Sequence, residues 1–107
     1  MADKSKRRLM LEASLAEDPG DAFLRYGLAL QCLREGEIEE GRERLTALIA
    51  DDPEQQVAAY QQLGQSLLET ADFDECRVIL TTGIAKAQAR GDLHAAAEMD
   101  GILMQLP

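Results

Sequence analysis

The chain has 107 residues, 46% of them hydrophobic and 29% charged, which suits one soluble globular domain with one core. It contains two Tyr, two Phe and no Trp, so Leu, Ile, Ala and Met must build that core, and this favours an all-α fold. The net charge is -9, and from Leu9 onward 7 basic residues face 19 acidic ones, so binding of nucleic acid or an anionic membrane is disfavoured.

No apolar run approaches the ~20 residues of a membrane span, and no secretion signal follows the basic KSKRR start, so we expect a cytoplasmic protein. KSKRR itself is typical of a solvated tail or the lead-in to a helix. Cys32 and Cys76 lie outside any CxxC motif, which predicts two reduced, buried thiols rather than a disulfide or a zinc site.

Apolar residues recur at three- and four-residue intervals along most of the chain, which is the periodicity of amphipathic helices. We expect Gly36 to end a helix in the left-handed conformation. Ala71 holds the same place in a later turn, which should be more strained because Ala disfavours that conformation. Asp72 and Asp92 are expected to cap the helices that follow them. The pattern predicts six helices, at about 5–17, 21–35, 37–51, 55–70, 73–89 and 92–105.

The sequence also repeats itself. LEASLAEDP at 11–19 matches LTALIADDP at 45–53 at an offset of 34 residues, and a degenerate copy, LTTGIAKAQ, follows at 80–88. LALQCLREGEIEEG at 28–41 similarly matches LGQSLLETADFDEC at 63–76. Because each unit holds two helical segments, this period predicts stacked helix pairs that bury their apolar faces against one another.

Four small residues fall at matching places in the two units. Ala29 and Gly64 lie in the first helices, and Gly41 and Cys76 lie in the second ones. Helices that cross closely need small side chains at the contact, so we expect these residues to set the spacing within each pair. This interpretation makes Cys76 a packing residue rather than a reactive thiol.

The second unit resembles the tetratricopeptide repeat (TPR) in its signature residues, which are Tyr60, Leu63, Gly64, Leu67, Cys76 and Leu80. The resemblance implies a right-handed α-solenoid of antiparallel helix pairs with about two and a half repeats. It assigns 5–18 to an N-terminal capping helix, 21–53 and 55–89 to two repeats, and 92–105 to a C-terminal capping helix. The end of the chain, GDLHAAAEMDGILMQL, is similar to that of small stand-alone bacterial TPR proteins of unassigned function.

The resemblance further implies a non-enzymatic module that binds a protein or peptide segment on the concave surface lined by the first helices. By position, that groove is expected to comprise Tyr26, Leu30, Leu33, Arg34, Gln61, Gln65, Leu68 and Glu69. A terminal helix that covered Leu30, Leu33 and Leu68 would leave no open groove. The alternative function is self-association into a homodimer through Leu30, Leu33 and the apolar last helix, which carries Met99, Ile102, Leu103 and Met104.

Residue patterns that support catalysis or a cofactor are not found in the sequence. It lacks a phosphate-binding Gly-rich loop and a nucleophile motif, and His94 with Glu98 supplies only two of the ligands that a metal site requires. The acidic residues between Glu35 and Glu43 alternate with Arg42 and its neighbours, which predicts surface ion pairs. We therefore expect no catalytic residues, no metal and no cofactor.

Overall fold

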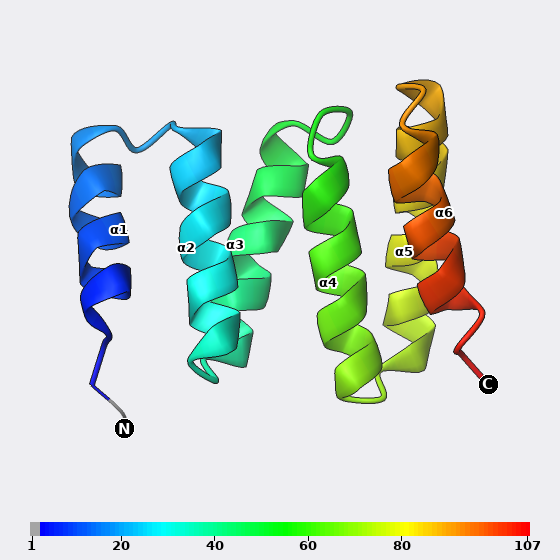
Figure 1. Ribbon diagram of the computed structural model, residues 1–107, viewed down its shortest axis with the longest axis horizontal. Helices are drawn as coiled ribbons and strands as arrows, with labels where there is room; N and C mark the ends of the chain where they lie inside the picture. Colours follow the sequence, from blue (N-terminus) through cyan, green and yellow to red (C-terminus); the bar gives the residue numbers. More distant parts are fainter. Residues whose placement is uncertain (1–2) are drawn as a thin grey trace.

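The computed structural model describes residues 3–107, which form six α-helices side by side within 36 × 29 × 20 Å (Figure 1). α1 and α6 lie at opposite ends of the row, with the two chain termini beside them. The described residues contain no strand, so the predicted all-α fold is confirmed. The helices are α1 Lys6–Glu17, α2 Ala22–Arg34, α3 Ile38–Asp51, α4 Val57–Glu69, α5 Phe73–Ala89 and α6 Leu93–Leu103.

Three helix starts follow the usual capping chemistry, and at α1 the Ser5 hydroxyl accepts a hydrogen bond from the Arg8 amide at 3.0 Å. Asp21 accepts a hydrogen bond from the Leu24 amide at 3.0 Å, and Asp92 accepts one from the Ala95 amide at 3.1 Å, as predicted for Asp92. These carboxylates satisfy amides that have no partner within the helix and help to fix where α2 and α6 begin.

Asp72 precedes α5 but makes no capping bond, so that prediction is wrong. Its carboxylate instead accepts a hydrogen bond from the Thr70 hydroxyl and lies 3.5 Å from Nη1 of Arg42. Arg42 is 30 residues away in the sequence. A capping rule that considers only neighbouring residues does not anticipate the contact between Asp72 and Arg42.

The turn between α4 and α5 is strained, as predicted. Gly36 and Gly91 have positive φ angles of 83° and 74°, which glycine adopts at little cost. Ala71 has a φ of 61° and is the one non-glycine residue of the described chain in this region. Its Cβ makes that conformation unfavourable by roughly 1 kcal/mol.

Close crossing within the helix pairs is also confirmed. A Cβ atom on Gly64 would lie 2.3 Å from Cδ2 of Leu80 in α5, and one on Gly41 would lie 2.6 Å from Cδ2 of Leu33 in α2. The buried thiol of Cys76 donates to the Gly64 carbonyl at 3.2 Å. The missing side chain of Gly64 therefore brings α4 and α5 into direct contact.

The last helix turns Met99 and Ile102, two of the residues named for the alternative of self-association, toward the core. Met99 and Ile102 are buried in the core and Leu103 is half-buried, whereas Met104 is exposed. Gly83 of α5 makes this possible, because a Cβ there would lie 2.7 Å from the sulfur of Met99. α6 thus closes the core, and most of the apolar surface assigned to self-association is already covered.

Candidate functional site

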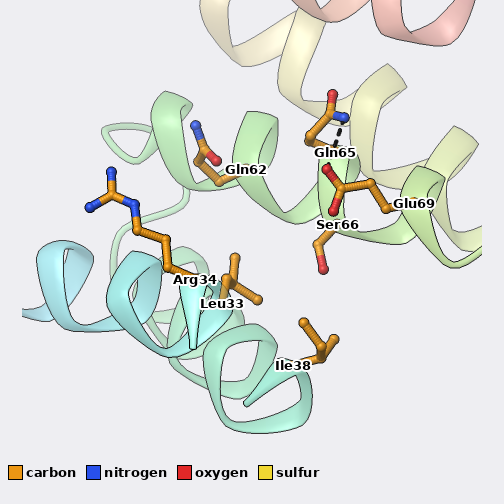
Figure 2. A pocket seen from close by; sticks show the side chains of 7 residues that line it. All are labelled: Leu33, Arg34, Ile38, Gln62, Gln65, Ser66 and Glu69. Carbon is orange, nitrogen blue, oxygen red and sulfur yellow. Dashed lines mark hydrogen bonds between the residues drawn. The ribbon is translucent and has the colours of Figure 1, made fainter. Parts of the chain in front are cut away.

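A groove separates the end of α2 and the start of α3 from α4 (Figure 2). Two aliphatic side chains, Leu33 and Ile38, lie between the facing backbones, and polar side chains surround them. The cavity holds about 240 Å³, which is enough for one or two side chains of a bound segment. Its lining comprises Leu33, Arg34, Ile38, Gln62, Gln65, Ser66 and Glu69.

Four of the eight residues assigned to the groove from the sequence lie together in this cavity, namely Leu33, Arg34, Gln65 and Glu69. They come from the last turn of α2 and the second half of α4. The start of α3 adds Ile38 beside them. The site therefore lies where one helix pair meets the next.

The other four residues lie outside this cavity. Tyr26 and Leu68 are half-buried and pack against the core, and Leu30 is half-buried further along α2. Gln61 turns toward α6, where its amide donates to the Glu98 carboxylate at 3.2 Å. These side chains flank the cavity rather than line it.

Sequence reasoning missed Gln62, Ser66 and Ile38 as lining residues. It also gave no attention to Phe23, which lies outside the cavity. Phe23 is 84% exposed, and its spacing of seven residues from Leu30 places both on one face of α2. That spacing could have identified Phe23 from the sequence. Gln62 follows Gln61 by one residue, so a rotation of about 100° decides which of the two faces the cavity.

The rim of the groove carries one cation and one anion. Gln65 donates to the Glu69 carboxylate at 3.3 Å, and Figure 2 shows this bond on the α4 side. Arg34 is exposed and forms no ion pair with any of residues 3–107. Because it has no ion-pair partner among these residues, the guanidinium of Arg34 is available to an acidic group on a partner.

The hydroxyl of Tyr26 lies near the groove. Burial raises the pKa of Tyr26, while a hydrogen bond with Gln62 and the charge of Arg34 act in the opposite direction.

The two thiols are buried packing residues, as predicted. Both are free, and burial raises the pKa of Cys32 and of Cys76, so neither is poised as a nucleophile. Nε2 of the exposed His94 lies 2.7 Å from the Glu98 carboxylate. Across residues 3–107, no group of three or more His, Cys, Asp or Glu side chains could hold a metal ion, and no helix is long and apolar enough to cross a bilayer.

Comparisons with known proteins point to one family, although no family model matches the sequence. A TPR repeat-containing protein of Pseudomonas aeruginosa is 32% identical over 96 residues, which span 90% of this chain and 90% of that protein. The solution structure of a protein from Bordetella parapertussis superimposes with a TM-score of 0.81 at 27% identity, covering 94% of this chain and 87% of that one.

The solution structure of a TPR domain protein from Salinibacter ruber gives a TM-score of 0.76 at 25% identity, over 82% of this chain and 88% of that one. TPR folds generally mediate protein–protein interactions, and TPR proteins are generally non-enzymatic scaffolds. Sequence identity, helix arrangement and repeat period agree, and the chain belongs to the tetratricopeptide repeat family.

Proposed function

We propose that this chain is a binding module that holds a segment of another protein in the groove between α2 and α4. The observation that carries the proposal is the aliphatic pair Leu33 and Ile38, enclosed by a polar rim that includes Arg34, a cation with no ion-pair partner within residues 3–107. An aliphatic side chain of a partner would remove both residues from water, and the rim would fix its orientation.

The chemistry of the rim defines the partner that fits. Arg34 suits a carboxylate, which a guanidinium can bind through two hydrogen bonds. Gln65 and Glu69 offer an amide and a carboxylate on the opposite side, which suit backbone groups or a basic side chain. The expected ligand is thus a peptide segment with one aliphatic residue between an acidic and a basic or polar residue.

Residues on either side of the cavity extend the proposed contact surface. Phe23 and Leu30 continue it along α2 as apolar contacts. In this proposal the chain divides into a cap at 5–18, repeats at 21–53 and 55–89, and a cap at 92–105, so the groove lies between the two repeats. The proposed partner-binding set remains Tyr26, Leu30, Leu33, Arg34, Gln61, Gln65, Leu68 and Glu69, with Gln62 and Ile38 added.

Selection of short random peptides displayed on phage tests this proposal. The parent protein should enrich peptides with an aliphatic residue close to an acidic one. The selected peptides should bind the Arg34→Glu variant about tenfold more weakly, because the attraction becomes a repulsion. Selection on that variant should favour basic residues at the same place.

Arg90→Glu is the matched control, because it makes the same change in charge at an exposed site outside the groove. It should leave the dissociation constants of the selected peptides unchanged. The groove proposal fails if the parent enriches no peptide sequence, or if Arg34→Glu binds the selected peptides as tightly as the parent does.

A further inference from the structure

No helix within residues 3–107 lies against one side of α1, at the place where a second helix of a repeat meets the first helix of its own pair. Arg7 corresponds to Gly41 of α3 at the 34-residue offset, and Gly41 is where α3 touches α2. Arg7 lies instead in an open, shallow depression of α1 with Met10, Leu11 and Ser14. Met10 is 69% exposed, so none of residues 3–107 covers this apolar surface.

α2 forms the second wall of this open position. Phe23, at the start of α2, is 84% exposed, and Gly27 lies one turn further along the same helix. A Cβ on Gly27 would lie 3.6 Å from Cδ2 of Leu11, so α1 and α2 meet beside it. Together the two helices leave a space where a first helix of a preceding pair would lie.

α6 has the complementary deficiency. It begins at the N-cap Asp92, as α4 begins at the N-cap Gln56, so Asp100 holds the place that Gly64 holds in α4. Gly64 contacts the second helix of its own pair, but no helix of the described chain faces Asp100 in that way. Leu93 and Met104 share this side of α6 and are 70% and 79% exposed.

We propose that α6 of one copy docks against α1 and α2 of a second copy, so that two half pairs form a complete helix pair across a head-to-tail interface. In the complete pair of α4 and α5, Gly64 meets Cys76 through a hydrogen bond of 3.2 Å. The repeat offsets place Arg7 at the position of Cys76, and the equal distance from the N-cap places Asp100 at the position of Gly64. The residues that line the cavity between α2 and α4 take no part in this contact. Phe23 is shared with the surface proposed to extend that cavity, so Arg34→Glu, which changes only the cavity, separates the two proposals.

Charge complementarity identifies the occupant as a second copy. Lys6 and Arg7 form no ion pairs within residues 3–107, and they belong to the only basic stretch of a chain that is strongly acidic from Leu9 onward. Asp100 is exposed and likewise has no ion-pair partner among these residues. α6 therefore offers an acidic group with flanking apolar residues to a basic helix with an exposed methionine.

The interface should be weak and sensitive to salt. Arg7 and Asp100 are larger than the glycine, alanine and cysteine at the complete crossings, so an ion pair at wider separation replaces close helix packing. Ion pairs of this kind are screened once the Debye length falls to about 3 Å at 1 M salt. A heterologous contact of this kind also repeats, so assemblies should grow with concentration rather than stop at a dimer.

Sedimentation velocity of the full chain across a concentration series at low ionic strength tests the proposal. The weight-average mass of the parent should rise with concentration and return to that of the monomer at about 1 M salt. Arg7→Glu and Asp100→Lys should each weaken association about tenfold. An equimolar mixture of these two variants should associate again. Glu at position 7 of one variant can pair with Lys at position 100 of the other, and the unchanged Asp100 and Arg7 can pair with each other.

Asp74→Lys is the matched control, since it changes the net charge as Asp100→Lys does but lies on α5, away from the interface. It should associate as the parent does, and circular dichroism should show that all variants keep their helix content. The proposal is overturned if the parent remains monomeric up to about 1 mM. It is equally overturned if the mixture of the two variants fails to associate.

Discussion

Arg8 of α1 and Arg42 of α3 hold equivalent repeat positions, 34 residues apart, yet they join successive helix pairs through different interactions. Nε of Arg42 donates to the Ser66 hydroxyl at 2.9 Å, and Nη2 donates to the Ser66 carbonyl and the Thr70 hydroxyl, each at 2.7 Å. These three acceptors are neutral and belong to the end of α4. The α3–α4 contact is therefore fixed mainly by hydrogen-bond geometry.

Arg8 makes the corresponding contact between α1 and the first pair, mainly through charge. It is 3% exposed, and its Nη2 lies 2.7 Å from the Glu40 carboxylate while its Nε lies 3.7 Å from Glu12. Nε makes no hydrogen bond within the described chain, and neither does Oε1 of Gln31, which holds the place of Ser66. A buried guanidinium with an unsatisfied nitrogen offsets much of the attraction that the ion pair supplies.

The difference shows that one repeat position can support two kinds of contact. Where the next helix offers Ser and Thr, the arginine is satisfied and should contribute to stability. Where it offers Gln31 and Glu35, the arginine is drawn toward carboxylates, and part of its hydrogen-bonding capacity is lost. The contact of α1 should therefore depend on solution conditions more than the contact of α4.

The largest effect expected from this comparison is a difference in the free energy of unfolding between the variants Arg42→Met and Arg8→Met. Arg42→Met should lower the free energy of unfolding by about 2–3 kcal/mol, because it removes three hydrogen bonds and leaves the hydroxyl of the buried Ser66 without its donor. Arg8→Met should change it by less than about 1 kcal/mol, because Lys4 and Arg44 still pair with the two carboxylates.

Urea unfolding of both variants, followed by circular dichroism, measures the difference. Arg42→Lys serves as a control that keeps the charge but loses the planar array of donors, so it should recover only part of the stability. Equal losses for Arg8→Met and Arg42→Met would show that the two contacts are equivalent, contrary to this account.

A second comparison concerns the crossings within the two pairs. Gly64→Ala should destabilise the protein by about 1–3 kcal/mol, because its Cβ would lie 2.3 Å from a leucine, Leu80, that is fully buried and cannot move aside. Gly41→Ala should cost less, since Leu33 is only half-buried and its side chain can rotate toward the groove. Thermal unfolding of both variants tests the order, and a larger loss for Gly41→Ala would contradict it.

The two turns offer a smaller contrast of opposite sign. Ala71→Gly should raise the free energy of unfolding by up to about 1 kcal/mol, because glycine relieves the strain of a φ of 61°. Gly36→Ala should lower it by a similar amount at a φ of 83°. Urea titrations of the two variants should therefore move the midpoint in opposite directions. A loss of stability in Ala71→Gly would mean that the flexibility of glycine in the unfolded chain outweighs the strain.

Most of the fold follows from local patterns in the sequence. The period of 34 or 35 residues, the apolar spacing and the small residues at the crossings identify the six helices and the contact of Gly64. The burial of Arg8 does not follow, because a basic run resembles a solvated tail until the acceptor on α3 is known. The Asp72 carboxylate, which does not cap α5, is bound by the nearby Thr70 hydroxyl and lies beside Arg42, and only the second of these contacts comes from across the fold.

The candidate site was less accessible to sequence reasoning, because groove residues were transferred by repeat position alone. Leu33, Arg34, Gln65 and Glu69 do line the cavity, since the last turn of each first helix keeps its orientation. The inward orientation of Met99 and Ile102 depends on Gly83 of a neighbouring helix. This orientation is set by a contact between two helices, and the apolar spacing within one helix does not specify such a contact.

The pH dependence of unfolding offers the finest test of the difference between the two contacts. The pKa of Glu40 is lowered chiefly by a hydrogen bond from Arg44, against the opposing effect of burial, and that of Glu35 by hydrogen bonds from Ser5 and Gln31. A carboxyl whose pKa is lower in the folded state stabilises the fold above its usual pKa of about 4.3. That stabilisation is lost as the pH falls through the lowered pKa.

Glu40→Gln should therefore flatten the fall in urea midpoint that the parent shows between about pH 5 and pH 3. Ser66→Ala, which alters the neutral contact of Arg42, should lower the midpoint at every pH and leave that slope unchanged. Parallel titrations of the parent and both variants would distinguish the contacts. If Ser66→Ala flattened the profile as much as Glu40→Gln, the acid sensitivity would not belong to the Glu40 carboxylate and its partners Arg44 and Arg8, and the division between a charge-based and a neutral contact would not hold.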